Sequence, residues 1–424
     1  GEFEKQWKKT GLASESMWYF FKSSYEELVM ALLRPMADQG KNGRACYDAE
    51  ALGPTRFNLC EKWYTRDDFE IVNKRNLKLV CSHWSLAPES GASASREGVA
   101  CVLYLHSTVG SRVEALQALV PSLRAGCSFL AFDFSGSGLS EGEYVTWGWF
   151  ENNDVVDMVQ HMHKTLGYKK VVFWGRNLGA ATALFYAAKD PRIKGLVLDT
   201  PFSSFEETLA EGVKFATREG ATVPRVVMKA AQAMIVRALR SRISPNFSTA
   251  KLCPKTVAKK CKQPALFAAA QRDIYIPRAQ VEGVFKAYAG KKKDLTTVDL
   301  RFYDSRRYRT CCEFLVRCEE FISATVGSAR LPLSEELGSP MNPRELEKDE
   351  FAWTVNNIQT VYRIQEQLSP EKRTVTADRP SFEVPGPESH FEDEDDGFKV
   401  AIEQIIVPGT ADGGAEESKN VQDE

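Results

Sequence analysis

Short apolar runs alternate with amphipathic helical patterns through the middle of the chain. Most of these runs are continuous rather than alternating, which is typical of strands that are buried on both faces of a sheet. Repeated strand-helix order of this kind predicts an α/β fold with a mostly parallel central sheet and helices on both faces. Strands are expected at 99–106, 128–134, 170–175, 195–200, 263–270 and 297–303, and helices at 112–124, 148–166, 177–189, 277–289 and 311–325.

Two further segments precede or interrupt this order. Apolar runs at 69–72 and 77–81 flank Asn73–Asn76 and predict a β-hairpin. Residues 202–262 form a largely helical insertion between two predicted strands. Because open parallel sheets bind ligands at the carboxyl ends of their strands, this insertion is expected to act as a lid. We therefore expect a main domain over 50–326 that includes the lid.

Both ends of the chain carry apolar faces outside the main domain. In the extension 1–49, apolar side chains recur at helical spacing within Met17–Leu33. In the Pro-containing linker 327–380, an apolar stripe over Phe351–Leu368 predicts an amphipathic helix at 344–368. We expect these two faces to bind other proteins. The chain's own core and, for the first face, a membrane surface are the alternatives.

Charge is distributed unevenly, although the net charge is only −2. Residues 251–310 carry 15 Lys or Arg against 5 Asp or Glu, whereas 381–424 carry 2 against 13. An acidic tail of this composition is expected to be disordered by itself. The basic stretch is either a solvated face or a surface that the tail or an acidic partner covers. It contains no known nucleic-acid-binding motif, so nucleic acid is not expected as a partner.

Cysteine and histidine usage predicts neither a disulfide framework nor a metal site. The ten cysteines are scattered without a C-x-x-C pair, and the five histidines do not cluster. Reduced core cysteines are typical of a reducing compartment, so we expect a cytoplasmic protein, including one associated with the cytoskeleton or an organelle. No apolar run is long enough to span a membrane and no signal-like stretch is present, although a targeting segment removed before Gly1 stays open. No cofactor is expected.

A strand-turn-helix motif centred on Asn177 carries the candidate chemistry. Gly175–Gly179, which reads Gly-Arg-Asn-Leu-Gly, has the layout of the nucleophile elbow G-x-S-x-G. Residues 104–112, 132–142 and 198–202 are similar to the motifs H-G-N-x-G-S-R, D-x-x-G-x-G-x-S-x-G and L-D-S-P-F. Through these motifs the chain resembles the α/β-hydrolase superfamily, and within it the serine aminopeptidase-like branch, over roughly 50–326. The resemblance implies an α/β-hydrolase fold with Ser, Asp and His at the top of the sheet.

The chain departs from that triad at two positions. Asn177 stands where the nucleophilic Ser belongs, and its amide nitrogen lone pair is delocalised, so it cannot attack an acyl carbon. The matching loops place Asp273 in the acid position and Arg306 nearest to the position of His. Arg cannot act as a general base at neutral pH, and no His occurs between residues 164 and 389. A degenerate triad is therefore predicted.

Remnants of the oxyanion hole are expected to persist. The backbone N–H groups of Thr108 and Leu178 occupy its positions, and main-chain donors do not depend on residue type. Ser107 replaces a Gly of the family motif, and His106 is expected to be a hydrogen-bonded structural residue. The chain is thus predicted to be a catalytically inactive hydrolase-fold protein that acts as a structural or adaptor subunit. A protein that binds a small molecule or a lipid or acyl group in the remnant pocket is the alternative, and a residual serine-type hydrolase is the third.

Overall fold

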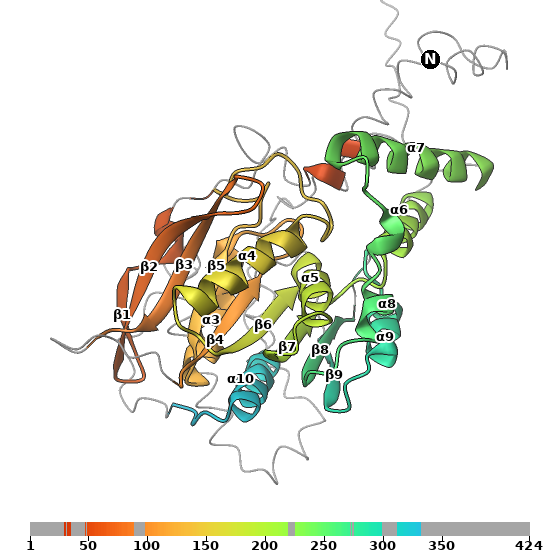
Figure 1. The fold of residues 1–424 in the computed structure, drawn as a ribbon. Coiled ribbons are helices and arrows are strands. Elements are labelled where there is room, and N and C mark those ends of the chain that lie inside the picture. Colours follow the sequence, from red (N-terminus) through yellow and green to blue (C-terminus); the bar gives the residue numbers. More distant parts are fainter. Residues whose placement is uncertain are drawn as a thin grey trace, which may run out of the picture.

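The computed structural model describes nine strands that form one sheet (Figure 1). Residues 29–30, 32–34, 47, 49–88, 98–218, 225–271, 273, 275–298 and 312–331 are described. The strands are β1 Arg56–Leu59, β2 Lys62–Val72, β3 Lys78–Leu86, β4 Ala100–Leu105, β5 Ser128–Phe132, β6 Lys170–Arg176, β7 Ile193–Asp199, β8 Ala265–Ala270 and β9 Lys293–Val298. Their order across the sheet is β1-β2-β3-β5-β4-β6-β7-β8-β9.

Most of the sheet is parallel, as predicted. Strands β5, β4, β6, β7, β8 and β9 pair in parallel, whereas β1, β2 and β3 form an antiparallel meander that joins the sheet through β3 and β5. The central strands are buried along their length, which explains their continuous apolar sequence. The predicted hairpin at 69–81 is present, but β1 was not predicted because only alternate residues of this four-residue strand are buried.

Helices cover both faces of the sheet (Figure 1). One face packs against α3 Leu116–Arg124 and α10 Cys312–Val326, and the other against α4 Glu151–Lys164, α5 Leu178–Ala187, α8 Pro254–Ala258 and α9 Arg278–Ala287. Successive side chains of β4 enter the two cores, since Leu103 lies in the core under α4 and α5 and Tyr104 in the core under α3 and α10. Short 3-10 helices lie at Ala49–Leu52, Arg112–Ala115 and Thr249–Lys251.

The predicted insertion at 202–262 has two structural parts. Helices α6 Phe205–Arg218 and α7 Arg225–Ile243 follow the carboxyl end of β7, where a lid was expected. The ring of Phe205 packs edge-on against Trp147, with centroids 5.3 Å apart. The last part, α8, instead lies on the sheet face beside α5 and α9. It contributes Ala258 to the core there, so this part of the insertion does not act as a lid.

Strand β9 begins earlier than the sequence pattern predicts. Its bounds are Lys293–Val298, whereas the apolar pattern predicted a strand at 297–303. It is the last strand at its end of the sheet, and all its residues before Val298 are exposed or only partly buried. Edge strands carry polar and charged side chains, so an apolar run does not mark where they start.

The end of the first predicted apolar face packs on the chain's own core. Val29, Leu32 and Leu33 are at most 3% exposed. The Trp147 indole N–H donates to the Leu32 carbonyl at 2.9 Å, and the Val145 N–H to that of Leu33 at 2.8 Å. This part of Met17–Leu33 therefore cannot bind a partner, which corrects the prediction for these residues. The rest of that face, the predicted helix at 344–368 and the acidic tail lie outside the described residues.

A buried ion pair joins the two helices on one face of the sheet. Arg124 at the end of α3 and Glu319 in α10 are both fully buried. Their two hydrogen bonds measure 3.0 and 3.2 Å, and Arg330 donates a further one to Glu319 at 2.6 Å. None of the described helices is both long and apolar enough to span a bilayer.

Replacing Glu319→Gln is expected to destabilise the fold by about 3–5 kcal/mol, because it leaves the buried Arg124 charge uncompensated. Urea unfolding followed by tryptophan fluorescence measures this change. Glu320→Gln is the matched control: its carboxylate is 47% exposed and 3.5 Å from Arg330. The control should cost less than about 1 kcal/mol. Equal effects of the two variants would contradict the assignment.

Candidate functional site

Asn177 forms the turn between β6 and α5, as the elbow motif predicts. Its backbone has φ 50° and ψ −107°, a positive-φ conformation that is strained for a residue with a Cβ. Its N–H donates to the Asp199 carbonyl at 2.8 Å. Its own carbonyl accepts the Ala181 N–H at 3.0 Å and so begins the helix. The turn is thus tied to β7 on one side and to α5 on the other.

The two glycines of the motif are required by close packing. A Cβ at Gly175 would lie 2.5 Å from the carbonyl of Gly179. A Cβ at Gly179 would lie 1.9 Å from the carbonyl oxygen of Leu105, at the end of β4. The first turn of α5 therefore lies directly against the carboxyl ends of β4 and β6.

The side chain of Asn177 is fastened to the loop after β4. It is 2% exposed, and its Oδ1 accepts a hydrogen bond from the Thr108 hydroxyl at 2.5 Å. Leu178 is the first residue of α5, where backbone N–H groups have no acceptor within the helix. Among the described residues, none accepts the backbone N–H of Thr108 or of Leu178. The structure therefore brings these three predicted site residues together.

Glu114 organises the loop between β4 and α3, a role that the sequence did not reveal. Its carboxylate accepts the Ser107 N–H at 2.9 Å and the Ser107 hydroxyl at 2.5 Å. The Tyr104 hydroxyl donates to it at 3.0 Å, and Arg176 of the elbow lies 3.7 Å away. Ser107 is thus held by this carboxylate through both its N–H and its hydroxyl. Its seven-residue spacing from Ser107 was the only signal in the sequence.

Asp273 follows the carboxyl end of β8, and Asn177 follows the carboxyl end of β6. Because the two strands run in the same direction, both residues lie at the carboxyl ends of the sheet's strands. It is 7% exposed, and its Oδ1 accepts the N–H groups of Tyr275 at 2.9 Å and Ile276 at 2.8 Å. These bonds are those of an aspartate that caps its own loop. Arg306, the third predicted triad position, lies outside the described residues.

Three of the four described histidines hydrogen-bond residues away from Asn177 and Asp273, and the fourth, His161, stacks on Phe69. His106 is buried, its Nε2 accepts the Phe134 N–H at 3.0 Å, and its Nδ1–H donates to the Ser107 carbonyl at 2.7 Å. This confirms its predicted structural role. His83 bonds the Tyr168 hydroxyl at 2.7 Å, and His163 bonds the carbonyl of the same tyrosine at 2.6 Å. In the part of the chain that the structure describes, no histidine hydrogen-bonds Asn177 or Asp273.

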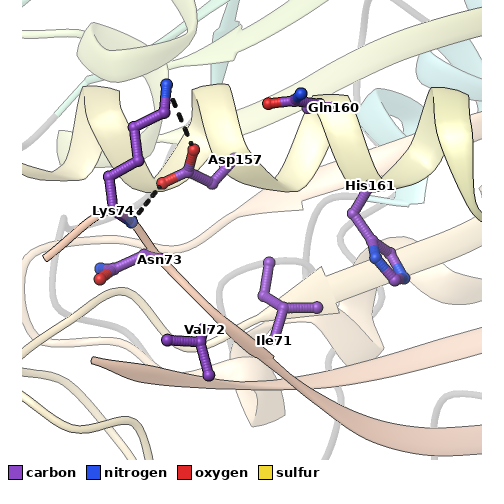
Figure 2. Close-up of a pocket in the computed structure, with 7 residues that line it drawn as sticks. All are labelled: Ile71, Val72, Asn73, Lys74, Asp157, Gln160 and His161. Atoms are coloured by element: carbon purple, nitrogen blue, oxygen red, sulfur yellow. Dashed lines mark hydrogen bonds and ion pairs between the residues drawn. The ribbon is translucent and has the colours of Figure 1, made fainter. Parts of the chain in front are cut away.

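A pocket of about 320 Å³ lies between β2 and α4, and it does not include the elbow (Figure 2). The Lys74 ammonium and the Asp157 carboxylate approach to 3.6 Å across it. In the described ranges, no three His, Cys, Asp or Glu residues gather closely enough to hold a metal ion. The pocket is lined by Ile71, Val72, Asn73, Lys74, Asp157, Gln160 and His161.

Comparison with known proteins agrees with this arrangement of strand, turn and helix. Residues 101–216 match the family model of the alpha/beta hydrolase fold. The protein has an α/β-hydrolase fold. The uncharacterised protein YqkD of Bacillus subtilis is 22% identical over 194 residues, which are 45% of this chain. That match spans 61% of YqkD, less than two thirds of its length.

Solved structures with this hydrolase fold are also similar. An esterase of Pyrococcus furiosus is 21% identical, with a TM-score of 0.48 over 62% of this chain and 92% of that chain. The 2,6-dihydroxy-pseudo-oxynicotine hydrolase is 16% identical, with a TM-score of 0.45 over 65% of this chain and 72% of that chain.

Gly179→Ala is expected to destabilise the protein by about 3 kcal/mol or more, because its methyl group would overlap the Leu105 carbonyl. The matched control is Gly212→Ala in α6, where a Cβ meets nothing within 4 Å. The control should leave stability unchanged or raise it by up to about 1 kcal/mol through helix propensity. Urea unfolding compares the two variants, and a Gly179→Ala protein of wild-type stability would refute the close approach.

Proposed function

We propose that this protein is a catalytically inactive α/β-hydrolase-fold protein that works as a structural or adaptor subunit of a larger assembly. The observation that carries the proposal is Asn177 at the tip of the elbow. Its amide is held by Thr108 and has no lone pair available to attack an acyl carbon. The turn keeps its positive φ with an asparagine at this position, so the proposed loss of the nucleophile is compatible with the fold.

The absence of a usable base supports the same proposal. The sequence contains no His between residues 164 and 389, and none of the described histidines hydrogen-bonds Asn177: three have other hydrogen-bond partners and His161 stacks on Phe69. The carboxylates nearest the elbow, Glu114 and Asp199, lie 3.7 and 3.9 Å from the Arg176 guanidinium. Glu114 also accepts the Ser107 N–H and the Tyr104 hydroxyl, and Asp199 accepts the Thr200 hydroxyl at 2.9 Å, so both carboxylates are engaged in contacts that hold the fold.

Thiols are poor substitutes for the missing serine. Of the seven cysteines whose side chains the structure describes, six are buried and Cys253 is partly buried. Burial raises the pKa of the Cys127 and Cys261 thiols to about 12. At neutral pH these side chains are therefore protonated, and the thiol form is not the nucleophile.

The adaptor role rests on the segments outside the hydrolase fold. The described end of the first apolar face is occupied by the chain's own core, as Val29, Leu32 and Leu33 show. The stripe over Phe351–Leu368 is then the better candidate for binding a partner protein. An amphipathic helix of this kind docks in an apolar groove through residues at i, i+3, i+4 and i+7.

Asn177→Ser alone is expected to give negligible esterase activity, because the restored hydroxyl still lacks a base. Asn177→Ser combined with Arg306→His should give measurable turnover, since triad members act as a unit. Hydrolysis of a p-nitrophenyl ester and labelling by a fluorophosphonate probe measure both variants. Asn177→Ala is the control for background hydrolysis. Labelling of the wild-type chain, or robust turnover by the single variant, would contradict the proposed loss of catalysis.

The native protein is expected to carry a partner protein in a fixed stoichiometry. Native mass spectrometry of the endogenous complex gives the masses of its subunits and their ratio. Val355→Asp and Ile358→Asp, which place charges in the stripe at 351–368, should release the partner. Asn356→Asp and Gln359→Glu, which alter neighbouring polar positions, are the matched control. A strictly monomeric native protein would contradict the adaptor role.

A further inference from the structure

Three loops meet at the amino ends of β7, β8 and β9. The Gln263 side-chain amide donates to the carbonyls of Ala187 at 2.8 Å and Asp190 at 3.2 Å, and its backbone carbonyl accepts the Tyr288 hydroxyl at 2.8 Å. The Ala265 N–H bonds the carbonyl of Lys292 at 3.0 Å. The loops before the three strands are therefore held side by side, although they come from distant parts of the sequence.

These loops form one strongly basic surface, which we call the basic face and define as residues 188–194, 259–264 and 288–293. It contains nine Lys or Arg and a single acidic residue, Asp190. Arg192 bonds that aspartate at 2.7 and 2.8 Å and holds the pKa of its carboxyl at about 2, so the pair is neutral overall. Seven of the lysines are exposed, namely Lys189, Lys194, Lys259, Lys260, Lys262, Lys291 and Lys292.

The exposed lysines of the basic face have no carboxylate partner among the described residues, unlike several exposed lysines elsewhere. Lys74, Lys78 and Lys286 each lie within 4.0 Å of a carboxylate. Among the described residues, no carboxylate forms an ion pair with any of the seven exposed lysines of the basic face. Positive charges gathered in this way repel one another and attract a polyanion.

The last described residues of the chain also lie near the amino ends of the strands. The Lys170 ammonium, at the start of β6, donates to the carbonyl of Val326 at 2.9 Å. The Leu331 N–H bonds the carbonyl of Arg124 at 2.8 Å, just before β5 begins. From β5 to β9 the sheet order gives five strand spacings, which amount to about 24 Å. The described chain thus ends within a short distance of the basic face.

The acidic segment 381–424 can reach this surface. About 60 residues separate Leu331 from the run Glu392–Asp396, which consists of five consecutive acidic residues. A flexible chain of that length spans about 40 Å, more than the width to be crossed. A helix at 344–368 within it would itself be about 37 Å long. Tethering also gives the segment an effective concentration in the millimolar range, which favours it over an untethered polyanion.

We propose that the acidic segment 381–424 of this same chain binds the basic face. The contact is electrostatic, between seven exposed lysines and a segment with 13 acidic against 2 basic residues. It lies at the amino ends of the strands, whereas the elbow lies at their carboxyl ends. Binding of the segment at the amino ends of the strands therefore leaves Asn177 free of direct contact with it.

Zero-length carbodiimide cross-linking of the dilute full-length chain tests the proposal, since it joins only amines and carboxylates in contact. Peptide mass spectrometry should find Lys262 and Lys292 joined to carboxylates of 381–424. A mixture of unlabelled and ¹⁵N-labelled chains should give cross-links within one isotopic form. The yield should fall in about 0.5 M salt, because exposed charges are then screened within a few ångströms.

Charge reversal on the basic face should lower the yield at Lys262 and Lys292 about tenfold, the effect of losing three surface ion pairs together. The variant carries Lys259→Glu, Lys260→Glu and Lys291→Glu. A matched control reverses three exposed lysines elsewhere and should keep the wild-type yield: Lys62→Glu, Lys78→Glu and Lys214→Glu. Neutralising the acidic run in the full chain should reproduce the loss: Glu392→Gln, Asp393→Asn, Glu394→Gln, Asp395→Asn and Asp396→Asn.

Four outcomes would overturn the proposal. The first is an absence of these cross-links in the wild-type chain, and the second is an equal loss in the control variant. The third is cross-linking only between differently labelled chains, which would assign the contact to a second copy. The fourth is displacement of the segment at physiological salt by single-stranded DNA or by phosphatidylserine vesicles, which would assign the basic face to nucleic acid or to a membrane.

Discussion

The first turn of α5 lies so close to the carboxyl end of β4 that only a glycine hydrogen fits between them. A Cβ on Gly179 would come within 1.9 Å of the Leu105 carbonyl oxygen. To enter that position directly after β6, the chain reverses direction at Asn177 with a positive φ. This one constraint aligns α5 with the ends of β4 and β6, and through the Asp199 carbonyl with β7. The sheet and its covering helices are arranged around that turn.

The same constraint explains how the fold persists without the chemistry that we propose it has lost. In an active serine hydrolase the nucleophilic serine sits at the strained turn, so the residue with the strained backbone is also the one that reacts. Here the residue at the turn carries an amide whose oxygen accepts the Thr108 hydroxyl. Glu114 and Arg176 then hold the neighbouring loop and strand end through charge-assisted contacts. The site is therefore well ordered by interactions that do not require catalysis.

The carboxyl ends of the parallel strands and their amino ends lie on opposite sides of the sheet, and this chain places different features at each. The elbow, the Thr108 loop and Asp273 follow the carboxyl ends of strands. The amino ends of β7, β8 and β9 instead carry loops rich in lysine, brought together by Gln263. Because each connection between parallel strands returns the chain to the amino end of the next strand, residues far apart in sequence gather there. The last described residue, Leu331, also lies near the amino end of a strand, β5.

Sequence alone was sufficient for features set by local pattern. Continuous apolar runs predicted the buried parallel strands, and the spacing Gly-x-Asn-x-Gly after a strand predicted the elbow. The missing histidine between 164 and 389 is also a fact of the sequence. Each of these depends on neighbouring residues or on residue type, so no contact across the fold was needed to infer it.

Only the tertiary structure decided the features made by distant contacts. The carboxylate of Glu114 holds Ser107, the face ending at Leu33 is covered by Trp147, and β9 starts at a charged residue because it lies at the sheet edge. Likewise, the basic stretch becomes a surface only when the loop at 188–194 is folded against it. Hydrophobic periodicity reports how a segment is buried but not which segment buries it. For that reason the core and the elbow were predictable, whereas the partners of individual side chains were not.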